Sequence, residues 1–303
     1  MIEMQSISEI MKRAFRKRIL IPAFNVAYIP MLKPIVETLV ECETFGLVEV
    51  ARLELKKFGA KSFEAVAEEY RALGDRRFTR LHLDHIPVID EDGVEVDWKD
   101  LIRKGLDLGY DSVMIDGSRL PLDKNIEVTK EVVDMAHERG RPVEAELGAV
   151  LGHEKEISMS YEEIYDKGVG FTDLAEASLF VNETSVDWLS VAIGNIHGAI
   201  SGAAKDKDKV QARLNIDHLR KLRETTGIPL VLHGGSGIKM EYVLSAIRNG
   251  ITKINIGTDI RQAYERALRS KEGNIEYAQQ EVSKKMRELI CQLYRIKGSA
   301  RKI

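Results

Sequence analysis

The sequence predicts a (β/α)8 TIM barrel, preceded by an extra N-terminal helix and followed by a C-terminal helical arm. Short apolar runs of strand-forming residues alternate along the chain with longer amphipathic stretches, which is typical of a parallel sheet covered by helices. There are eight such runs, and eight parallel strands close a barrel of this type. A doubly wound open sheet is the alternative, because periodicity cannot show closure. No linker, repeat or low-complexity segment divides the chain, so we expect residues 1–303 to form a single domain.

The predicted strands are the eight apolar runs, at residues 20–26, 46–51, 80–85, 112–117, 143–148, 188–194, 229–235 and 253–258. Amphipathic patterns such as "WKDLIRKGLDLGY" lie between them and predict helices. Near the N-terminus, Ser6 is followed three residues later by Glu9, a capping-box pattern that predicts the start of a helix. The tail after about residue 262 is helical and charged, and we expect it to pack on the barrel or on a second subunit.

The composition gives no reason to expect nucleic acid or an anionic membrane as a partner, because the formal net charge is only −3. No segment approaches the roughly 20 apolar residues that a membrane span needs. Cys42 and Cys291 are the only cysteines, and they lie far apart in the sequence without metal-type spacing. We therefore expect no disulfide framework and a reducing, cytoplasmic setting.

Polar side chains gather at the carboxyl ends of the predicted strands. They are Asp84, His85, Asp116, Glu146, His197, His233, Asn255 and Thr258. In an α/β barrel these strand ends meet on one face, where active sites lie. Three imidazoles with a nearby carboxylate form the ligand set of a zinc-type ion that keeps one position open for substrate. We therefore predict a metal centre, although each of these histidines taken alone is more often structural.

Two glycine-rich segments indicate a phosphate site. "HGGSG" (233–237) follows the seventh predicted strand and "NIGTD" (255–259) follows the eighth. Barrels commonly bind phosphate between these two loops, with backbone N–H groups as donors. The pair of loops predicts a phosphorylated substrate, whereas either loop alone would be weak evidence.

Taken together, these segments resemble the class II, metal-dependent ketose-bisphosphate aldolases, the family of the zinc-dependent fructose-bisphosphate aldolases. The resemblance rests on "PAFNV", "LHLDH", "SVMIDGSRLP", "NIEVTKEVVDMAHERGRPVEAELG", "VAIGNIHGA", "IPLVLHGGSGI" and "KINIGTDIR". Their order and spacing cover residues 21 to 261. The resemblance implies a lyase of carbohydrate metabolism that releases dihydroxyacetone phosphate.

For the metal centre, the resemblance implies that His85, His197 and His233 hold a catalytic zinc ion. Glu146 is then the alternative zinc ligand, and Asp116 with Glu146 forms a position for a second divalent ion. A monovalent cation, K⁺ or Na⁺, is the further cofactor that the resemblance suggests.

For the reaction, the resemblance implies that Asp84 handles the proton on the C4 oxygen of the ketose, and that Glu154 exchanges the proton at C3. A carboxylate can take a hydroxyl proton if it lies within hydrogen-bond reach of it. A bound metal stabilises the negative charge that cleavage leaves on the carbonyl-derived oxygen. The substrate-binding residues are Asn25, Gly198, Gly234, Gly235, Ser236, Asn255, Gly257, Thr258 and Arg261, the last as a partner of the distal phosphate.

Three other histidines and Lys253 are given no catalytic role. His82 lies within a predicted strand, and we interpret it as a packed core residue or a partner of a metal ligand. His137 and His218 lie on helical stretches and receive no role. A lysine Schiff base is an alternative mechanism on the same fold, but Lys253 opens the eighth predicted strand at the end away from the site. The metal route is therefore favoured.

The sequence departs from the family pattern in the part of the site that would bind the aldehyde half. Ala51 replaces a serine that helps to bind the distal phosphate, Ser201 replaces a lysine, and Gly257 replaces an aspartate. A small residue at the last position also occurs in tagatose-bisphosphate aldolases. "IPVIDEDG" replaces the usual glycine-serine turn after "LHLDH".

We therefore expect an enzyme that cleaves fructose 1,6-bisphosphate to dihydroxyacetone phosphate and glyceraldehyde 3-phosphate. Tagatose bisphosphate or another ketose phosphate is the alternative substrate. A non-catalytic sugar-phosphate-binding subunit and a metal-dependent isomerase or epimerase are the alternatives of other classes. We expect the chain to form a homodimer or homotetramer.

Overall fold

Eight parallel strands form a closed barrel, as the sequence predicts, and the first strand pairs with the last. The computed structural model describes residues 5–148, 161–195, 213–235 and 238–303. The strands follow one another around the barrel in chain order: β1 (Ile21–Asn25), β2 (Gly46–Ala51), β3 (Thr79–Pro87), β4 (Ser112–Asp116), β5 (Val143–Leu147), β6 (Trp188–Val191), β7 (Leu230–Leu232) and β8 (Ile251–Ile256). Closure rules out the open-sheet alternative.

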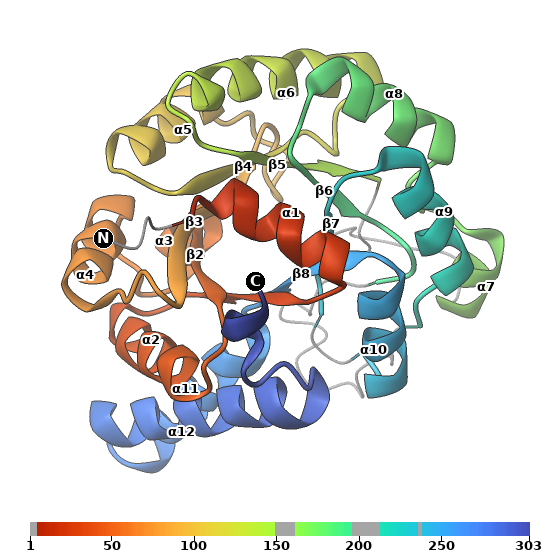
Figure 1. The fold of residues 1–303 in the computed structure, drawn as a ribbon. Coiled ribbons are helices and arrows are strands. Elements are labelled where there is room, and N and C mark those ends of the chain that lie inside the picture. The colour runs from red at the N-terminus through yellow and green to blue at the C-terminus, as the bar shows by residue number, and fades with distance from the viewer. Residues whose placement is uncertain (1–4, 149–160, 196–212, 236–237) are drawn as a thin grey trace.

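Helices surround the barrel on its outside (Figure 1). They are α1 (Ile7–Lys17), α2 (Leu32–Glu41), α3 (Arg52–Lys57), α4 (Phe63–Leu73), α5 (Trp98–Asp107), α6 (Leu122–His137), α7 (Tyr161–Lys167), α8 (Leu174–Thr184), α9 (Ile216–Thr226), α10 (Met240–Asn249), α11 (Thr258–Ser270) and α12 (Ile275–Arg287). Three short helical turns complete the described elements: η1 (Ile29–Met31), η2 (Glu288–Leu293) and η3 (Ser299–Lys302).

The predicted strand boundaries differ from the observed ones by two residues or more at one or both ends of β3, β6, β7 and β8. The chain leaves strand conformation early after β6 and β7, where Gly194 (φ 105°) and Gly234 (φ 68°) have left-handed backbone angles. The prediction for β8 starts and ends two residues late, because the strand begins directly after Gly250 and Thr258 already belongs to α11. This shift moves Lys253 from the predicted start of the strand to its middle.

Helix α1 closes the amino-terminal end of the barrel (Figure 1). The predicted capping box is present: the Ser6 hydroxyl accepts the backbone N–H of Glu9 (3.2 Å), and Glu9 accepts the backbone N–H of Ser6 (3.1 Å). Its buried face packs with Trp188 and other barrel residues in one apolar cluster. Burying each large aliphatic side chain contributes about 1.5–3 kcal/mol, so α1 stabilises the end of the barrel that lies away from the strand carboxyl ends.

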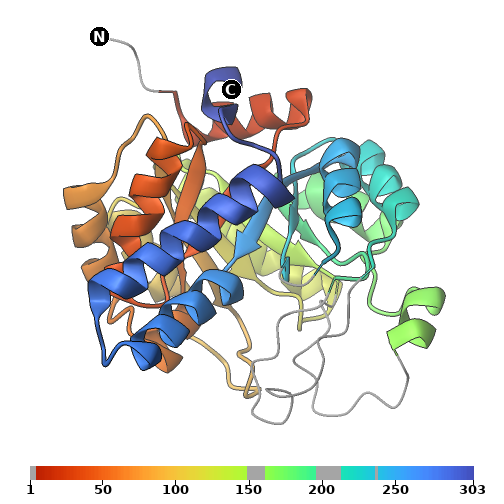
Figure 2. The ribbon, with the colours of Figure 1, turned by 90° about the horizontal axis from the view of Figure 1, so that it is seen from below.

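The C-terminal arm packs on the barrel, one of the two positions predicted for it (Figure 2). Helix α12 lies against α11 and α2, and Gln279 donates a hydrogen bond to the carbonyl oxygen of Pro30 (2.8 Å). Lys17 at the end of α1 donates to the carbonyl oxygen of Lys302 (2.6 Å), so the two ends of the described chain meet on the same face of the barrel.

Cys42 is buried and Cys291 is exposed, and neither forms a disulfide. Within the described residues, no helix combines the length and the apolar composition that crossing a bilayer requires.

Candidate active site

Asp84 and His85 both reach the site because β3 is irregular at this point. Successive residues of a regular strand face opposite sides, but the register between β3 and β4 shifts between Leu83 and Ile86. His85 has a φ of 28°, a left-handed angle that is uncommon outside glycine. Such bulges redirect side chains near active sites, and this one brings two adjacent polar residues to the same centre.

The Asp84 carboxylate is held by two amides. Asn25 on β1 donates to Oδ2 (2.9 Å) and Asn255 on β8 donates to Oδ1 (2.8 Å), and the Asp84 side chain is only 2% exposed. Burial raises the pKa of Asp84, but the positive charges of His85 and Lys253 lower it more, so the pKa lies well below its usual range. Asp84 is therefore an oriented, ionised carboxylate at the carboxyl end of the barrel.

Three donor atoms converge beside Asp84. His233 Nδ1 is 2.6 Å from His85 Nε2, and Glu146 Oε2 is 3.6 Å from His233 Nδ1 and 3.9 Å from His85 Nε2. All three atoms lie within 4.8 Å of one another, so one ion could contact them together. Two imidazole nitrogens and a carboxylate oxygen are typical zinc donors.

The outer nitrogens of both histidines face carboxylates. Asp116 Oδ2 is 3.4 Å from His85 Nδ1, and Glu144 Oε1 is 2.8 Å from His233 Nε2. Metal-binding histidines commonly have such a partner, which fixes the ring orientation. The predicted role of Asp116 at a second metal position stays a prediction, since its described side-chain partners here are His85 and the backbone N–H of Ser118 (3.0 Å).

The electrostatics of the three donors fit a cation. Burial lowers the pKa of His85, but Asp116, Asp84 and Glu146 outweigh it and raise the pKa to about 10. Burial and the charge of Asp116 raise the pKa of Glu146 to about 8. Burial and the charge of His85 lower the pKa of His233. His85 and Glu146 are therefore the donors that hold protons, and a divalent ion would supply positive charge in place of those protons.

Lys253 lies below this centre, inside the barrel, and corrects the expectation that it sits at the far end of β8. Its Nζ is 2.8 Å from Glu144 Oε2, 3.3 Å from Glu49 Oε2 and 4.0 Å from Asp84 Oδ1, and the side chain is fully buried. The interior position of Lys253 could have been predicted from the sequence, because Lys253 and Asn255 are two residues apart on one strand and share a face.

Lys253 is nevertheless unsuited to form a Schiff base. Burial lowers its pKa, but the carboxylates of Glu144, Glu49 and Asp84 raise it above the ordinary lysine value. A protonated amine is not nucleophilic. The lysine alternative therefore fails for an electrostatic reason and not for the positional reason expected from the sequence.

His82 occupies the same interior layer. Its Nδ1 is 2.7 Å from Ser112 Oγ, and its Nε2 is 3.6 Å from Glu144 Oε2. Burial and the charge of Lys253 lower its pKa to about 3, so the ring is neutral. It lies next to Glu144, the carboxylate that orients His233, and its interpretation as a packed core residue or a partner of a metal ligand stays a prediction.

The described residues of the two glycine segments also lie at this end of the barrel. Gly234 and Gly235 follow β7, and Gly257 is the N-cap residue of α11, whose first residue is Thr258. A Cβ on Gly235 would lie 2.7 Å from Ile254 Cγ2, and one on Gly257 would lie 3.2 Å from Asn25 Oδ1. Glycine therefore lets the backbone pass close to its neighbours, and the N-terminus of a 13-residue helix favours an anion.

Arg261, the predicted partner of a distal phosphate, is engaged within its own helix. It pairs with both carboxylate oxygens of Glu265 (2.9 and 3.0 Å), and its guanidinium lies 4.6 Å from the centre of the Phe58 ring. Its role toward substrate stays a prediction. Four other predicted site residues lie outside the described residues: Glu154, His197, Gly198 and Ser236.

Comparison with known proteins identifies the family. The family described as "Fructose-bisphosphate aldolase class-II" matches residues 5–302. The chain belongs to this family. A fructose-bisphosphate aldolase of Geobacillus stearothermophilus is 32% identical over 268 residues, which cover 87% of this chain and 84% of that protein. One of Giardia intestinalis is 33% identical over 272 residues, 82% of this chain and 76% of that protein.

Solved structures share the fold of this chain. The YdjI aldolase of Escherichia coli K12 matches with a TM-score of 0.76 at 27% identity, covering 97% of this chain and 98% of that one. A putative fructose-1,6-bisphosphate aldolase of Coccidioides immitis also has a TM-score of 0.76, at 22% identity and 98% coverage of both chains, and shows the shared fold. Class II aldolases are zinc-dependent lyases, and the convergent donors at His85, Glu146 and His233 fit that dependence.

In this class II aldolase, Glu54 is a rim residue that sequence reasoning missed. Its carboxylate accepts the backbone N–H of Ala51 (2.7 Å), and Ala51 pairs with Asp84 in the β2–β3 ladder. Burial and then the negative charge of Asp84 raise the pKa of Glu54 to about 8. The stretch "ARLE", which begins with the last residue of the strand, could have pointed to Glu54, because the family pattern already differs at Ala51.

Proposed function

We propose that the chain is a metal-dependent aldolase that reversibly cleaves fructose 1,6-bisphosphate to dihydroxyacetone phosphate and glyceraldehyde 3-phosphate. One observation supports this most directly: an ionised Asp84, held by two amides, lies beside the convergent donors of His85, His233 and Glu146. A fixed base next to a candidate metal centre is what cleavage of a β-hydroxy ketone requires. Residues 1–303 would form one catalytic domain.

In the proposed reaction, Asp84 takes the proton of the C4 hydroxyl. The C3–C4 bond then breaks, C4 becomes the aldehyde carbon, and the electron pair of the bond moves to C3. Glu154 would return a proton to C3. A zinc ion held by His85, His197 and His233 would supply the Lewis acidity that stabilises negative charge on the carbonyl-derived oxygen.

The chain's own groups would orient the substrate through its dihydroxyacetone phosphate half. Backbone N–H groups after β7 and at the start of α11 are suited to a phosphate. The residues proposed for this half are Asn25, Gly198, Gly234, Gly235, Ser236, Asn255, Gly257 and Thr258, with K⁺ or Na⁺ as a further ion and Arg261 toward the distal phosphate. Asp116 and Glu146 would hold a second divalent ion.

A second candidate substrate is a ketose 1-phosphate whose distal end is uncharged, and Glu54 supports it. Ala51 offers no hydroxyl to a distal phosphate, and the Glu54 carboxyl group at the same rim offers no positive charge to pair with one. Tagatose bisphosphate remains the alternative with two phosphates.

The test is a coupled assay for dihydroxyacetone phosphate release from fructose 1,6-bisphosphate, tagatose 1,6-bisphosphate and fructose 1-phosphate, each with zinc and with chelator. Chelator-sensitive cleavage of fructose bisphosphate in preference to the others would support the first proposal. Preference for fructose 1-phosphate would support the second, and Glu54→Ala should then shift the kcat/KM ratio toward the bisphosphate. The matched control is Glu68→Ala, an exposed glutamate on α4.

No cleavage of any of the three by the zinc-loaded protein would contradict both substrate proposals. Binding of sugar phosphates without turnover would instead favour the non-catalytic subunit, and product isomers without aldehyde release would favour an isomerase or epimerase. We further propose that the enzyme is cytoplasmic and forms a homodimer or homotetramer. Sedimentation of the purified chain would test the oligomeric state.

A further inference from the structure

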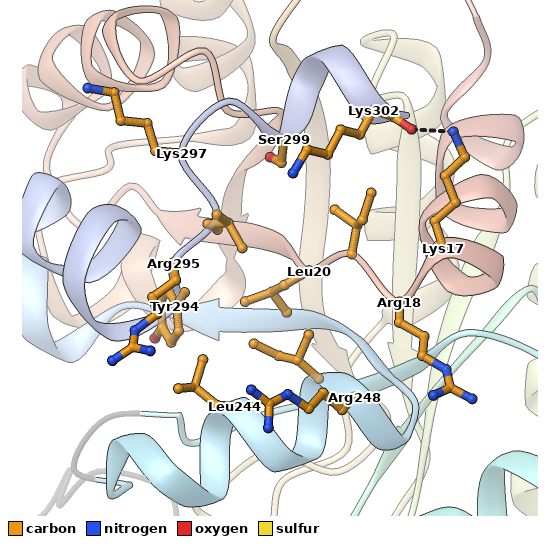
Figure 3. Close-up of a pocket in the computed structure, with 13 residues that line it drawn as sticks. Lys17, Arg18, Leu20, Leu244, Arg248, Tyr294, Arg295, Lys297, Ser299 and Lys302 are labelled. Carbon is orange, nitrogen blue, oxygen red and sulfur yellow. Dashed lines mark hydrogen bonds between the residues drawn. The ribbon is translucent and has the colours of Figure 1, made fainter.

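A second concave site lies at the opposite end of the barrel from Asp84. Figure 3 shows it between the end of α1, helix α10 and the C-terminal segment after η2. Its volume is about 620 Å³, within the usual range of small-molecule sites. Nothing in the proposed aldolase reaction uses it.

The charge of this cavity is one-sided. Six of its lining residues are cationic: Lys17, Arg18, Arg248, Arg295, Lys297 and Lys302. None of its described lining residues is acidic, and in the described part of the chain none of these six is within 4.0 Å of a carboxylate oxygen. The chain as a whole has a net charge of −3, so this concentration of positive charge is opposite to the average.

Helix ends explain only part of the cluster. Lys17 and Arg248 lie in the last turns of α1 and α10, where a cation favours the helix dipole. Lys302 ends the short turn η3, whereas Arg295 and Lys297 lie between η2 and η3 and belong to no helix. Cations from three separate parts of the chain therefore line one cavity.

A buried hydroxyl adds an independent observation. Ser299 lines the same cavity and is only 3% exposed, and its Oγ has no hydrogen-bond partner among the described residues. A buried polar atom without a partner is unfavourable by about 1–3 kcal/mol, so a ligand oxygen would satisfy the Ser299 hydroxyl once that hydroxyl turns toward the cavity. Apolar side chains complete the wall, including Leu20, Leu244 and Ile296.

From this arrangement we infer that the cavity binds a small organic molecule with two or more phosphate groups. The cations would pair with the phosphate oxygens, Ser299 would donate to one of them, and the apolar wall would contact the organic part. A concave site of this size fits a small molecule better than the extended backbone of a nucleic acid or a flat membrane surface.

The test uses the zinc-loaded full chain and titrates ADP by calorimetry, with zinc content measured before and after. We expect saturable binding of ADP. The affinity should fall at least about tenfold in the double variant Arg248→Gln/Arg295→Gln, because it loses charge-assisted hydrogen bonds to the phosphates. Ser299→Ala, which removes one hydroxyl, should weaken binding by several-fold, on the order of one hydrogen bond. Inorganic phosphate alone should bind more weakly than ADP.

Three controls separate this cavity from other sources of binding. Arg266→Gln/Arg269→Gln removes two exposed arginines of α11 and should leave ADP affinity unchanged. An equal loss in that variant would mean general charge attraction and would overturn the inference. Binding that dihydroxyacetone phosphate displaces, or that Asn255→Ala abolishes, would place ADP in the candidate active site and overturn it too. Absence of ADP binding at millimolar concentration would also contradict the inference. So would a protein that binds single-stranded RNA or anionic vesicles but does not bind ADP.

Discussion

Asp84 is surrounded by groups that favour its ionised form and fix its direction. The amides of Asn25 and Asn255 each donate to one carboxylate oxygen, and the charge of Lys253 lies 4.0 Å from Oδ1. A base that is already ionised can take a hydroxyl proton without first losing its own. The proposed role of Asp84 therefore depends on side chains from β1, β3 and β8 that only the closed barrel brings together.

We expect Asp84→Ala to lower kcat by about 10²–10⁴-fold, the usual contribution of a general acid–base group. Zinc should remain bound, because the donors of His85, His233 and Glu146 are unchanged. The measurements are zinc per chain and the rate of dihydroxyacetone phosphate release. Asp84→Asn is the matched control for shape and should be similarly slow. Substantial turnover in either variant would sink the assignment.

Lys253 compensates buried negative charge in the barrel interior. Lys253→Met would leave Glu144, Glu49 and Asp84 facing one another without a cation, and we expect the free energy of unfolding to fall by about 3–5 kcal/mol. Urea denaturation measures this change. Lys221→Met, on the exposed face of α9, is the control and should stay within about 0.5 kcal/mol of the parent. Equal stability of both variants would show that the interior charge is compensated without Lys253.

At the scale of elements, Asp90 connects the segment after β3 to helix α3. Oδ1 accepts the backbone N–H groups of Val94 (3.0 Å) and Asp92 (3.1 Å), while Oδ2 accepts from Arg52 (3.1 Å) and Lys56 (3.3 Å) on α3. Helix α3 also contains Glu54. This one buried carboxylate therefore orders both pieces of chain that form the rim beside Asp84.

The same carboxylate predicts a pH dependence of stability. Burial raises the pKa of Asp90, but the Val94 N–H, Lys56 and the other donors lower it more, to about 2. Because the folded pKa is below the ordinary value of about 3.9, the stabilisation is present above about pH 4 and is lost as the pH falls toward 2. We expect Asp90→Asn to be less stable by roughly 1–3 kcal/mol at pH 7, with a difference that shrinks between pH 4 and pH 2. Urea titrations at several pH values test this, and a constant difference would contradict it.

At the scale of the whole molecule, the two ends of the barrel have different tasks. The carboxyl ends of the strands hold the polar site, whereas α1 closes the other end with an apolar face. In barrels of this kind, residues at the closed end serve stability and not chemistry. Substitutions in α1 should therefore change the stability of the protein without changing its catalytic activity.

Met11→Ala tests this separation. Met11 is fully buried between α1 and the barrel, and its truncation should lower the free energy of unfolding by about 2–5 kcal/mol. At a temperature where the variant is folded, kcat/KM should stay within about twofold of the parent, because the change removes no interaction with the transition state. Denaturant titration and steady-state kinetics measure the two effects. A tenfold loss of kcat/KM in a fully folded sample would show that α1 communicates with the site.

Much of the fold follows from local sequence pattern. The alternation of strand and helix periods, the count of eight and the Ser6–Glu9 cap depend on residues that are close in the sequence, so the chain alone predicts them. The polar residues at strand ends were also visible, since all strands of a parallel barrel end on one face. Closure itself was not visible, because the pairing of β1 with β8 joins the two ends of the pattern.

The sequence by itself determined the alternation of eight strands with helices, the family and the chemical types gathered at the carboxyl ends of the strands. Only the tertiary structure decided which of these groups touch. It showed that the bulge in β3 turns His85 toward His233, that Lys253 lies inside the barrel, and that Glu54 stands at the rim beside Asp84. Periodicity describes neighbours along one strand, whereas these contacts depend on register between strands that are distant in the chain, and a shift of a single residue changes which side chains face the site.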